Sequence, residues 1–227
     1  MEKKEIQSQA RFLPAITGLF VAVLIISNIA STKIAQMGLL VLDAGTILFP
    51  LSYIFGDILT EVYGYKKARQ VIWTGFLSLV LMSVVFFIVG LLPPAEGWGN
   101  QPAYDLILGV VPRIAIASII AYFAGEFSNS FLLAKMKIMT NGKMLWARTI
   151  GSTIVGQGVD TALFTIIAFY GVLPFDVFLA LVASNYVFKV GVEVAFTPVT
   201  YKVTGFLKKE EGIDAYDYDT DFSPFKT

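Results

Sequence analysis

Six stretches of this sequence are long and apolar enough to cross a lipid bilayer. A hydrocarbon core of about 30 Å requires about 20 predominantly apolar residues in a helix. The stretches that meet this requirement are residues 12–32, 41–64, 70–92, 106–133, 145–171 and 175–205. Because backbone groups inside lipid must find their hydrogen bonds within the protein, the sequence predicts an all-α polytopic membrane protein with six transmembrane helices. The composition agrees, since 56% of the 227 residues are hydrophobic and 15% are charged.

Positive charge is confined to alternate connections between these stretches. Lys and Arg cluster before the first stretch, between the second and third, between the fourth and fifth, and after the sixth. The other connections, such as PPAEGWGNQPAYD, are nearly free of them. The positive-inside rule therefore predicts that both termini are cytoplasmic. Residues 1–11 would form a cytoplasmic N-terminus, 12–205 the membrane domain, and 206–227 an acidic and aromatic cytoplasmic tail, which we expect to be solvated or partly disordered.

The sequence lacks the residues that several classes of function require. The sequence has no Cys and no His, which removes thiolate nucleophiles, Cys/His metal sites and histidine proton shuttles. Lys and Arg equal Asp and Glu at 17 each, which argues against a nucleic-acid partner. The Gly56–Asp57 pair resembles one motif of intramembrane aspartyl proteases, but the second aspartate would lie in the tail. We therefore expect a protein that is not an enzyme and that carries no cofactor.

The second stretch contains residues that interrupt a helix. Asp43, Gly45 and Pro50 fall in its first half. Proline removes a backbone donor and clashes with the preceding turn, and its neighbour Phe49 is pushed away from helical dihedrals. Two interpretations remain open: a simple proline kink, or a broken helix that restarts near Pro50. Asp57 would then lie about 10 Å below Pro50 on nearly the same face.

Two carboxylates follow in that stretch at helical spacing. Asp57 and Glu61 share one face because they are four residues apart. Glu61 lies within a turn of Lys66, so we expect it to form an ion pair at the membrane interface. Asp57 is deeper, and we expect it to line a polar cavity.

Other polar residues also occur at membrane depth, where each central charge costs about 2.5–3.5 kcal/mol. Asp160 and Lys189 are the natural partners of opposite charge. Arg113 either extends to the outer surface or neutralises an inward carboxylate. A buried pair is compatible with a purely structural role, but several polar groups at similar depth favour a cavity. The polar residues in question are Asn28, Gln157, Asp160, Asn185, Lys189 and Glu193.

Short motifs along the chain resemble those of the bacterial queuosine precursor transporter family, of vitamin-uptake-transporter type. The matching pieces are Ser27–Asn28, Phe49–Pro50 with Asp57, Gly64 and Ala68–Arg69, the run Arg113–Ser118, Ser152–Thr153 with Asp160–Thr161, and Asn185–Lys189. The DTDFSPF segment near the end is also similar to tails of that family. The resemblance covers nearly the whole chain, and it depends on the order and spacing of the pieces.

The resemblance implies import of 7-cyano-7-deazaguanine and 7-aminomethyl-7-deazaguanine across the bacterial inner membrane. The N–H donors on a guanine-like edge suit a carboxylate, either Asp57 or Asp160. Amide side chains would bind the remaining polar atoms, and an aromatic ring would stack on the base. The predicted substrate-binding residues are Asn28, Phe49, Asp57, Arg113, Gln157, Asp160, Asn185, Tyr186 and Lys189.

One alternative function belongs to a class of proteins that also has six transmembrane helices. Substrate-capturing subunits of energy-coupling vitamin uptake complexes also have six, and they dock an ATPase partner through small-residue surfaces such as Gly18 and Ala22. The sequence has no Walker A loop, so any ATP use would come from another chain. Beyond the lipid bilayer and a small-molecule substrate, the sequence leaves open whether the chain forms a homo-oligomer.

The alternation of basic connections predicts where reporter proteins will be found. A reporter fused after Thr227, or inserted between residues 135 and 143, should be cytoplasmic. A reporter inserted between residues 96 and 101 should be external, as judged by paired phosphatase and fluorescent-protein fusions. A cytoplasmic signal from residues 96–101 would contradict the six-span topology.

Overall fold

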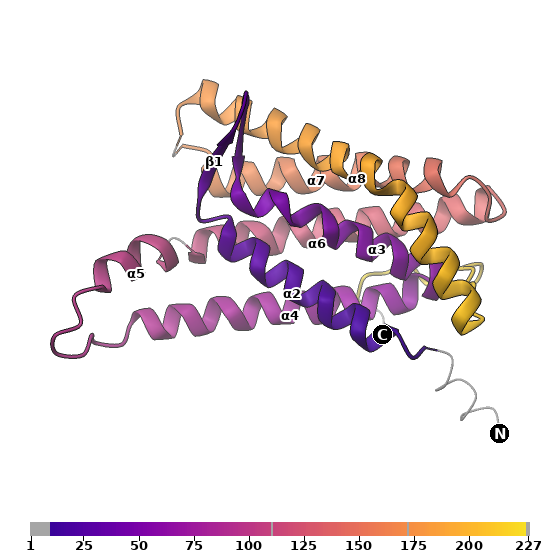
Figure 1. Cartoon of the computed structure of the whole chain (residues 1–227), viewed down its shortest axis with the longest axis horizontal. Helices are drawn as coiled ribbons and strands as arrows, with labels where there is room; N and C mark the ends of the chain where they lie inside the picture. Colours follow the sequence, from indigo (N-terminus) through magenta and orange to yellow (C-terminus); the bar gives the residue numbers. More distant parts are fainter. Residues whose placement is uncertain (1–9, 110, 172, 226–227) are drawn as a thin grey trace.

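The computed structural model describes residues 10–109, 111–171 and 173–225, and it is built mainly of long helices (Figure 1). Five of them are long and apolar enough to cross a membrane. They are α2 (Leu13–Ala30), α4 (Tyr65–Gly90), α6 (Val111–Met139), α7 (Leu145–Phe169) and α8 (Phe175–Glu211). A short helix, α5 (Gln101–Leu108), lies between α4 and α6. The expected all-α polytopic membrane protein is confirmed, with five candidate spans in the described residues.

The second apolar stretch is not one helix. It contains strand β2 (Leu40–Asp43), which pairs with β1 (Ile34–Met37) in an antiparallel hairpin, and the 3-10 turn η1 (Ala44–Ile47). The helix α3 (Phe49–Tyr63) follows, with Pro50 in its first turn. The broken-helix interpretation is therefore correct and the simple kink is not. With 15 residues, α3 is about 22 Å long, which is too short to cross the bilayer alone.

Local hydrogen bonds hold the break in place. The backbone N–H of Thr46 donates to the side chain of Asp43, which caps η1. Gly45 lies directly against Ser31 and the backbone carbonyl of Ser27 on α2, where a Cβ atom would collide with both. Pro50 needs no backbone donor at the start of a helix, where that N–H would have no partner in the helix. Groups within the protein therefore supply hydrogen bonds to the interrupted backbone, as the lipid environment requires.

Helix α3 lies at the centre of the bundle. It packs against α2, α4, α6 and α8, and nearly all its side chains are buried. Gly64, with φ of 82°, ends α3 and allows α4 to begin at the next residue. In contrast, α4 exposes one apolar face, as expected for contact with lipid. The exposed residues on that face include Leu77, Leu81, Val84, Phe87 and Ile88.

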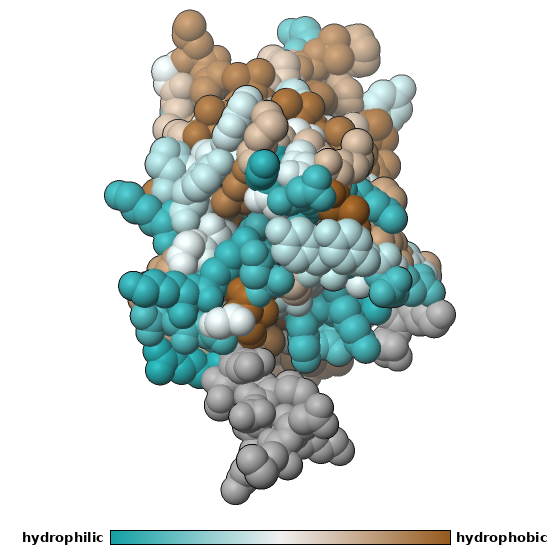
Figure 2. Space-filling model, turned by 90° about the vertical axis from the view of Figure 1, so that its right-hand side faces the viewer, coloured by the Kyte–Doolittle hydropathy of each residue, from teal (hydrophilic) through white to brown (hydrophobic). Residues whose placement is uncertain are grey.

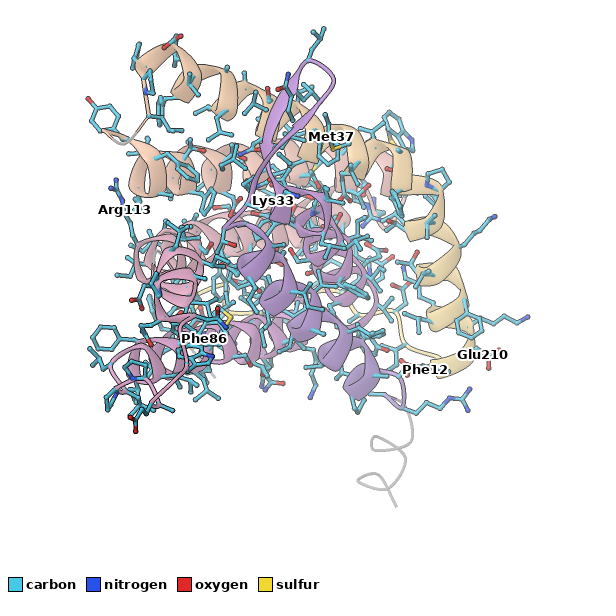
Figure 3. All side chains as sticks on the ribbon, turned by 60° about the vertical axis from the view of Figure 1, so that its left-hand side comes forward. Phe12, Lys33, Met37, Phe86, Arg113 and Glu210 are labelled. Atoms are coloured by element: carbon cyan, nitrogen blue, oxygen red, sulfur yellow. The ribbon has the colours of Figure 1, made fainter. Side chains whose placement is uncertain are left out.

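The two ends of the bundle differ. Figure 1 shows the start of α2 and the end of α8 at the end of the bundle that also holds the α3–α4 and α6–α7 connections. Hydrophilic side chains gather over much of this end, which faces the viewer in Figure 2. Figure 3 places Phe12 and Glu210 there, while Arg113, Phe86 and the hairpin residue Met37 lie away from it. We refer to the two ends as the tail side and the hairpin side.

The segment after α8 packs onto the tail side, although the sequence led us to expect a solvated tail. The Asp217 carboxylate accepts the backbone N–H of Tyr65 at 3.1 and 3.0 Å, which caps the start of α4. Phe222 packs on the Tyr65 ring with centroids 5.0 Å apart, and Trp73 Nε1 donates to the Pro224 carbonyl at 2.8 Å. These contacts show that a polar, aromatic segment can be ordered by partners that lie far away in the sequence.

The close approach of η1 to α2 predicts a stability effect at Gly45. Gly45→Ala should lower the free energy of unfolding by about 1–3 kcal/mol, because the added methyl group meets backbone as well as a side chain. Gly18→Ala is the matched control, since a Cβ there meets nothing within 4 Å. Thermal unfolding of both variants in detergent would measure the difference. Equal midpoints would contradict the described packing.

Candidate functional site

Buried polar side chains form three groups along α3. The first, the hairpin-side cavity, lies around Phe49 at the start of the helix. The second, the central cluster, consists of Asp57, Glu126 and Glu193. The third, the tail-side cluster, surrounds Glu61 near the end of the helix. From Phe49 to Glu61 is 12 residues, or about 18 Å of helix.

The hairpin-side cavity is lined by residues from seven elements and has a volume of about 10 Å³, roughly the space of one water molecule. Its free space is too narrow for a bicyclic base unless side chains move. The break before α3 brings β2 and η1 to its wall, and α2, α3, α6, α7 and α8 supply the other residues. The lining residues are Asn28, Ser31, Asp43, Thr46, Phe49, Ser118, Asp160, Phe164 and Lys189.

Asp43 is held in the cavity wall by neutral donors. Its Oδ1 accepts the hydroxyl of Ser31 at 2.7 Å, and its Oδ2 accepts the hydroxyl of Thr46 at 2.7 Å. Asn185 Nδ2 donates to Oδ2 at 3.1 Å from α8. Asp43 therefore joins α2, η1 and α8 through its side chain.

Asp160 and Lys189 form the ion pair that the sequence predicts. Lys189 Nζ lies 2.8 Å from Asp160 Oδ2, and both side chains are almost fully buried. The same ammonium lies over two aromatic rings, 4.4 Å from the centroid of Phe49 and 6.0 Å from that of Phe164. The cavity thus combines a carboxylate, a cation and two apolar ring faces.

Five of the nine predicted site residues meet here. Asn28, Phe49, Asp160 and Lys189 line the cavity, and Asn185 contacts it through Asp43. Four others lie elsewhere. They are Asp57, Arg113, Gln157 and Tyr186, none of which is among the lining residues.

Each of those four has its own surroundings. Asp57 belongs to the central cluster, and Gln157 is fully buried on α7. Arg113 lies exposed at the hairpin side (Figure 3), where it donates to the carbonyls of Ile167 and Tyr170 at 2.9 and 3.0 Å. This matches the interpretation in which its side chain extends to the surface. The hydroxyl of Tyr186 donates to a backbone carbonyl on α7 at 3.2 Å.

The tail-side cluster is an ion network centred on Glu61. Arg148 binds both carboxylate oxygens of Glu61, and Lys208 Nζ lies 2.6 Å from Oε1. Lys137 Nζ lies 3.6 Å from the same oxygen. The expected partner Lys66 is exposed instead, and Glu61 is 1% exposed. The interfacial Glu61–Lys66 pair is therefore wrong, because the helix buries Glu61 among cations from α6, α7 and α8.

The tail closes this network. Asp214 lies 2.6 Å from Lys137 Nζ and 2.9 Å from Lys208 Nζ. Partial burial raises the pKa of Asp214, but hydrogen bonds from Lys137 and Lys208 outweigh this and hold the pKa below its ordinary value. Lys137 also donates to the carbonyl of Ala215 at 2.6 Å. The tail thus completes the ion network at the tail side.

Sequence reasoning left several of these residues out of the site. Asp43 and Thr46 were visible as an Asp followed by Thr three residues later, a pattern typical of a capping turn. Glu193 follows Lys189 by four residues and shares its stripe. Arg148 carried no local signal, because its pairing with Glu61 joins residues 87 positions apart.

Comparison with known proteins identifies the family to which this chain is similar. Residues 43–203 match the family described as "Putative vitamin uptake transporter". The chain is 30% identical to the "Probable queuosine precursor transporter" of Bacillus subtilis over 86% of each chain. It is 27% identical to the "Queuosine precursor transporter" of Escherichia coli over 70% of this chain and 71% of that one. No solved structure matches this chain.

The chain belongs to the queuosine precursor transporter family. The match to the family begins at Asp43, so it includes the capping turn, α3 and the cavity residues on α6, α7 and α8. Membership agrees with a non-enzymatic membrane protein. Among the described residues, no group of three His, Cys, Asp or Glu side chains is arranged to hold a metal ion.

The tail-side network predicts a large effect at Glu61. Glu61→Gln should lower the free energy of unfolding by about 3–5 kcal/mol, because it leaves buried cations without their carboxylate. Glu210→Gln is the matched control, since its pair with Arg11 is exposed and should contribute about 0–1 kcal/mol. Unfolding in detergent measured for both variants would test this. A Glu61→Gln protein as stable as the control would contradict the buried network.

Proposed function

We propose that this protein imports 7-cyano-7-deazaguanine and 7-aminomethyl-7-deazaguanine into the cytoplasm across the bacterial inner membrane. The observation that carries the proposal is the hairpin-side cavity, in a chain whose relatives are named queuosine precursor transporters. Small-molecule sites combine apolar walls with a few placed polar groups. This cavity has both.

Recognition of the base edge is assigned to the polar wall. The ring N–H and the exocyclic amine of a guanine-like base donate side by side, and a carboxylate accepts such a pair. Asp160 takes this role, because Asp43 already accepts from Ser31 and Thr46. The amide of Asn28 lines the same cavity and binds the remaining polar atoms of the base.

Stacking is assigned to the two phenylalanine rings. In this conformation the Lys189 ammonium lies over Phe49 and Phe164. A flat aromatic ligand uses the same ring faces, so its entry requires Lys189 to move aside. Lys189 then neutralises Asp160 in the empty protein and releases it for the base. This exchange leaves no carboxylate without a partner at either stage.

A six-crossing topology with both ends cytoplasmic is part of the proposal. The short α3 covers about 22 Å, and the hairpin and η1 extend the same segment toward the hairpin side. Basic residues of the α3–α4 and α6–α7 connections then face the cytoplasm. The hairpin-side cavity faces outward, and the tail-side cluster faces inward.

Substitution of Asp160 tests the assigned base-edge contact. Asp160→Asn should weaken binding of 7-cyano-7-deazaguanine by roughly ten- to a hundredfold, the loss of a charge-assisted hydrogen bond of about 1.5–3 kcal/mol. Asp105→Asn is the matched control, because Asp105 is exposed on α5. Calorimetric titration of the purified proteins measures both. Unchanged affinity in Asp160→Asn would contradict the assignment.

Transport itself is tested with the protein alone in liposomes. Labelled 7-cyano-7-deazaguanine should enter, and vitamins of unrelated structure should not compete. Uptake only after addition of an ATPase complex would favour the capture-subunit alternative. A vitamin that binds while both deazapurines fail would contradict the proposed substrate class.

A further inference from the structure

The central cluster is not used by the proposed substrate site. Asp57 on α3, Glu126 on α6 and Glu193 on α8 are each fully buried. The carboxyl of Glu193 lies close to that of Asp57, and Glu126 is near enough to interact with both. Asp57 Oδ2 and both carboxyl oxygens of Glu126 and of Glu193 are buried without a hydrogen-bond partner among the described residues. Three acidic side chains from three helices therefore meet in the middle of the bundle.

The surroundings do not neutralise these carboxyls. Among the described residues, no Lys or Arg lies within ion-pair distance of any of the three. Arg148 from α7 acts on Asp57 electrostatically, but it is bound to Glu61. The groups facing the cluster from the packed elements are Tyr53 and Glu61 on α3, Tyr122, Asn129 and Ser130 on α6, and Arg148 and Asp160 on α7.

Neutral polar groups point into the same space without a complete set of partners. Asn129 Nδ2 donates to Asp57 Oδ1 at 2.7 Å, while Asn129 Oδ1 has no hydrogen-bond partner among the described residues. The Tyr122 hydroxyl faces Glu126 and is unpartnered in the same sense. Both side chains are fully buried. Such atoms are ready to accept or donate a bond when the protonation of the cluster changes.

We propose that the central cluster is a proton-binding site that couples proton entry to substrate movement. Two carboxyls in contact cannot both be ionised in a dry interior, so Asp57 and Glu193 share one proton, as paired acids do. Glu126, which has no cation within ion-pair distance, holds another. A metal ion is not the ligand, since these side chains do not form a metal-binding group among the described residues. The coupling rests on the proposed transport function, whereas the proton site does not.

The position of the cluster suits a relay. Tyr53 is near enough to interact electrostatically with Asp160, Glu126 and Asp57, and its hydroxyl donates to the carbonyl of Gly156 at 3.4 Å. It therefore lies within reach of both the cavity residue Asp160 and the cluster. One proton from the hairpin-side solution binds a carboxylate oxygen of the Asp57–Glu193 pair. It leaves to the tail-side solution when the Glu61 network opens, and the carboxylate is restored. No other bond forms or breaks.

A spectroscopic measurement tests the proton site without any substrate. Infrared difference spectra of the purified protein between acidic and alkaline pH should show the carbonyl band of a protonated carboxylic acid that titrates. Glu193→Gln should remove the part of that band due to the proton shared with Asp57, leaving the contribution of Glu126. Glu96→Gln, in the exposed loop after α4, should leave the whole band unchanged. Because glutamine matches the protonated form in shape, Glu193→Gln should unfold at the wild-type temperature. If that variant fails to fold, the same infrared measurement on Asp57→Asn should show the same change in the band. A wild-type spectrum with no titrating carboxylic acid would overturn the proposal.

Liposomes with a trapped pH dye test the coupling. An inward gradient of one pH unit should drive accumulation of 7-cyano-7-deazaguanine by up to about tenfold for one proton, with acidification of the lumen. Glu193→Gln should abolish accumulation and acidification but keep exchange of labelled for unlabelled substrate. Wild-type uptake that stops at equal concentrations, or that follows a sodium gradient, would overturn proton coupling and leave the transport function intact. Absence of all uptake alongside a titrating carboxyl band would instead overturn the transport function and the coupling with it, leaving only the proton site.

Discussion

The interrupted backbone before Pro50 is the constraint on which this structure depends. Inside a membrane, each backbone N–H and C=O needs a partner within the protein. The β1–β2 hairpin, the Asp43 cap and the first turn of α3 meet that requirement in sequence. The result is a short helix that can lie wholly inside the bundle, because it need not reach lipid headgroups at both ends.

The central place of α3 explains how acidic groups can be buried beside it at three depths, two of them on α3 itself and one on α7. Phe49 opens onto a cavity in which Asp160 is balanced by Lys189. Asp57 lies among other acids, and Glu61 lies among cations from three helices. The partners of the buried carboxyl group therefore differ at each of the three depths, and so does the way in which the cost of burial is reduced. Three separate groups of buried polar side chains therefore follow one another along α3, from the hairpin side to the tail side.

Much of this arrangement could be predicted from the sequence. The length of the apolar stretches predicts the long helices, and Pro50 with its neighbours predicts the break before α3. The spacing of Asn185, Lys189 and Glu193 gave a buried stripe on α8, and all three are buried. The partner of Glu61 could not be predicted, because Arg148 is brought to it only by the packing of α7 on the other helices. Nor could the order of the tail, since Asp217 finds its partner at the start of α4.

A structure of the protein with bound 7-cyano-7-deazaguanine tests the account most directly. The account predicts the base between the rings of Phe49 and Phe164, with its N–H edge on Asp160 and Lys189 displaced from its present position. Ligand in the central cluster, or on the lipid-facing surface, with the Asp160–Lys189 pair unchanged, would contradict it.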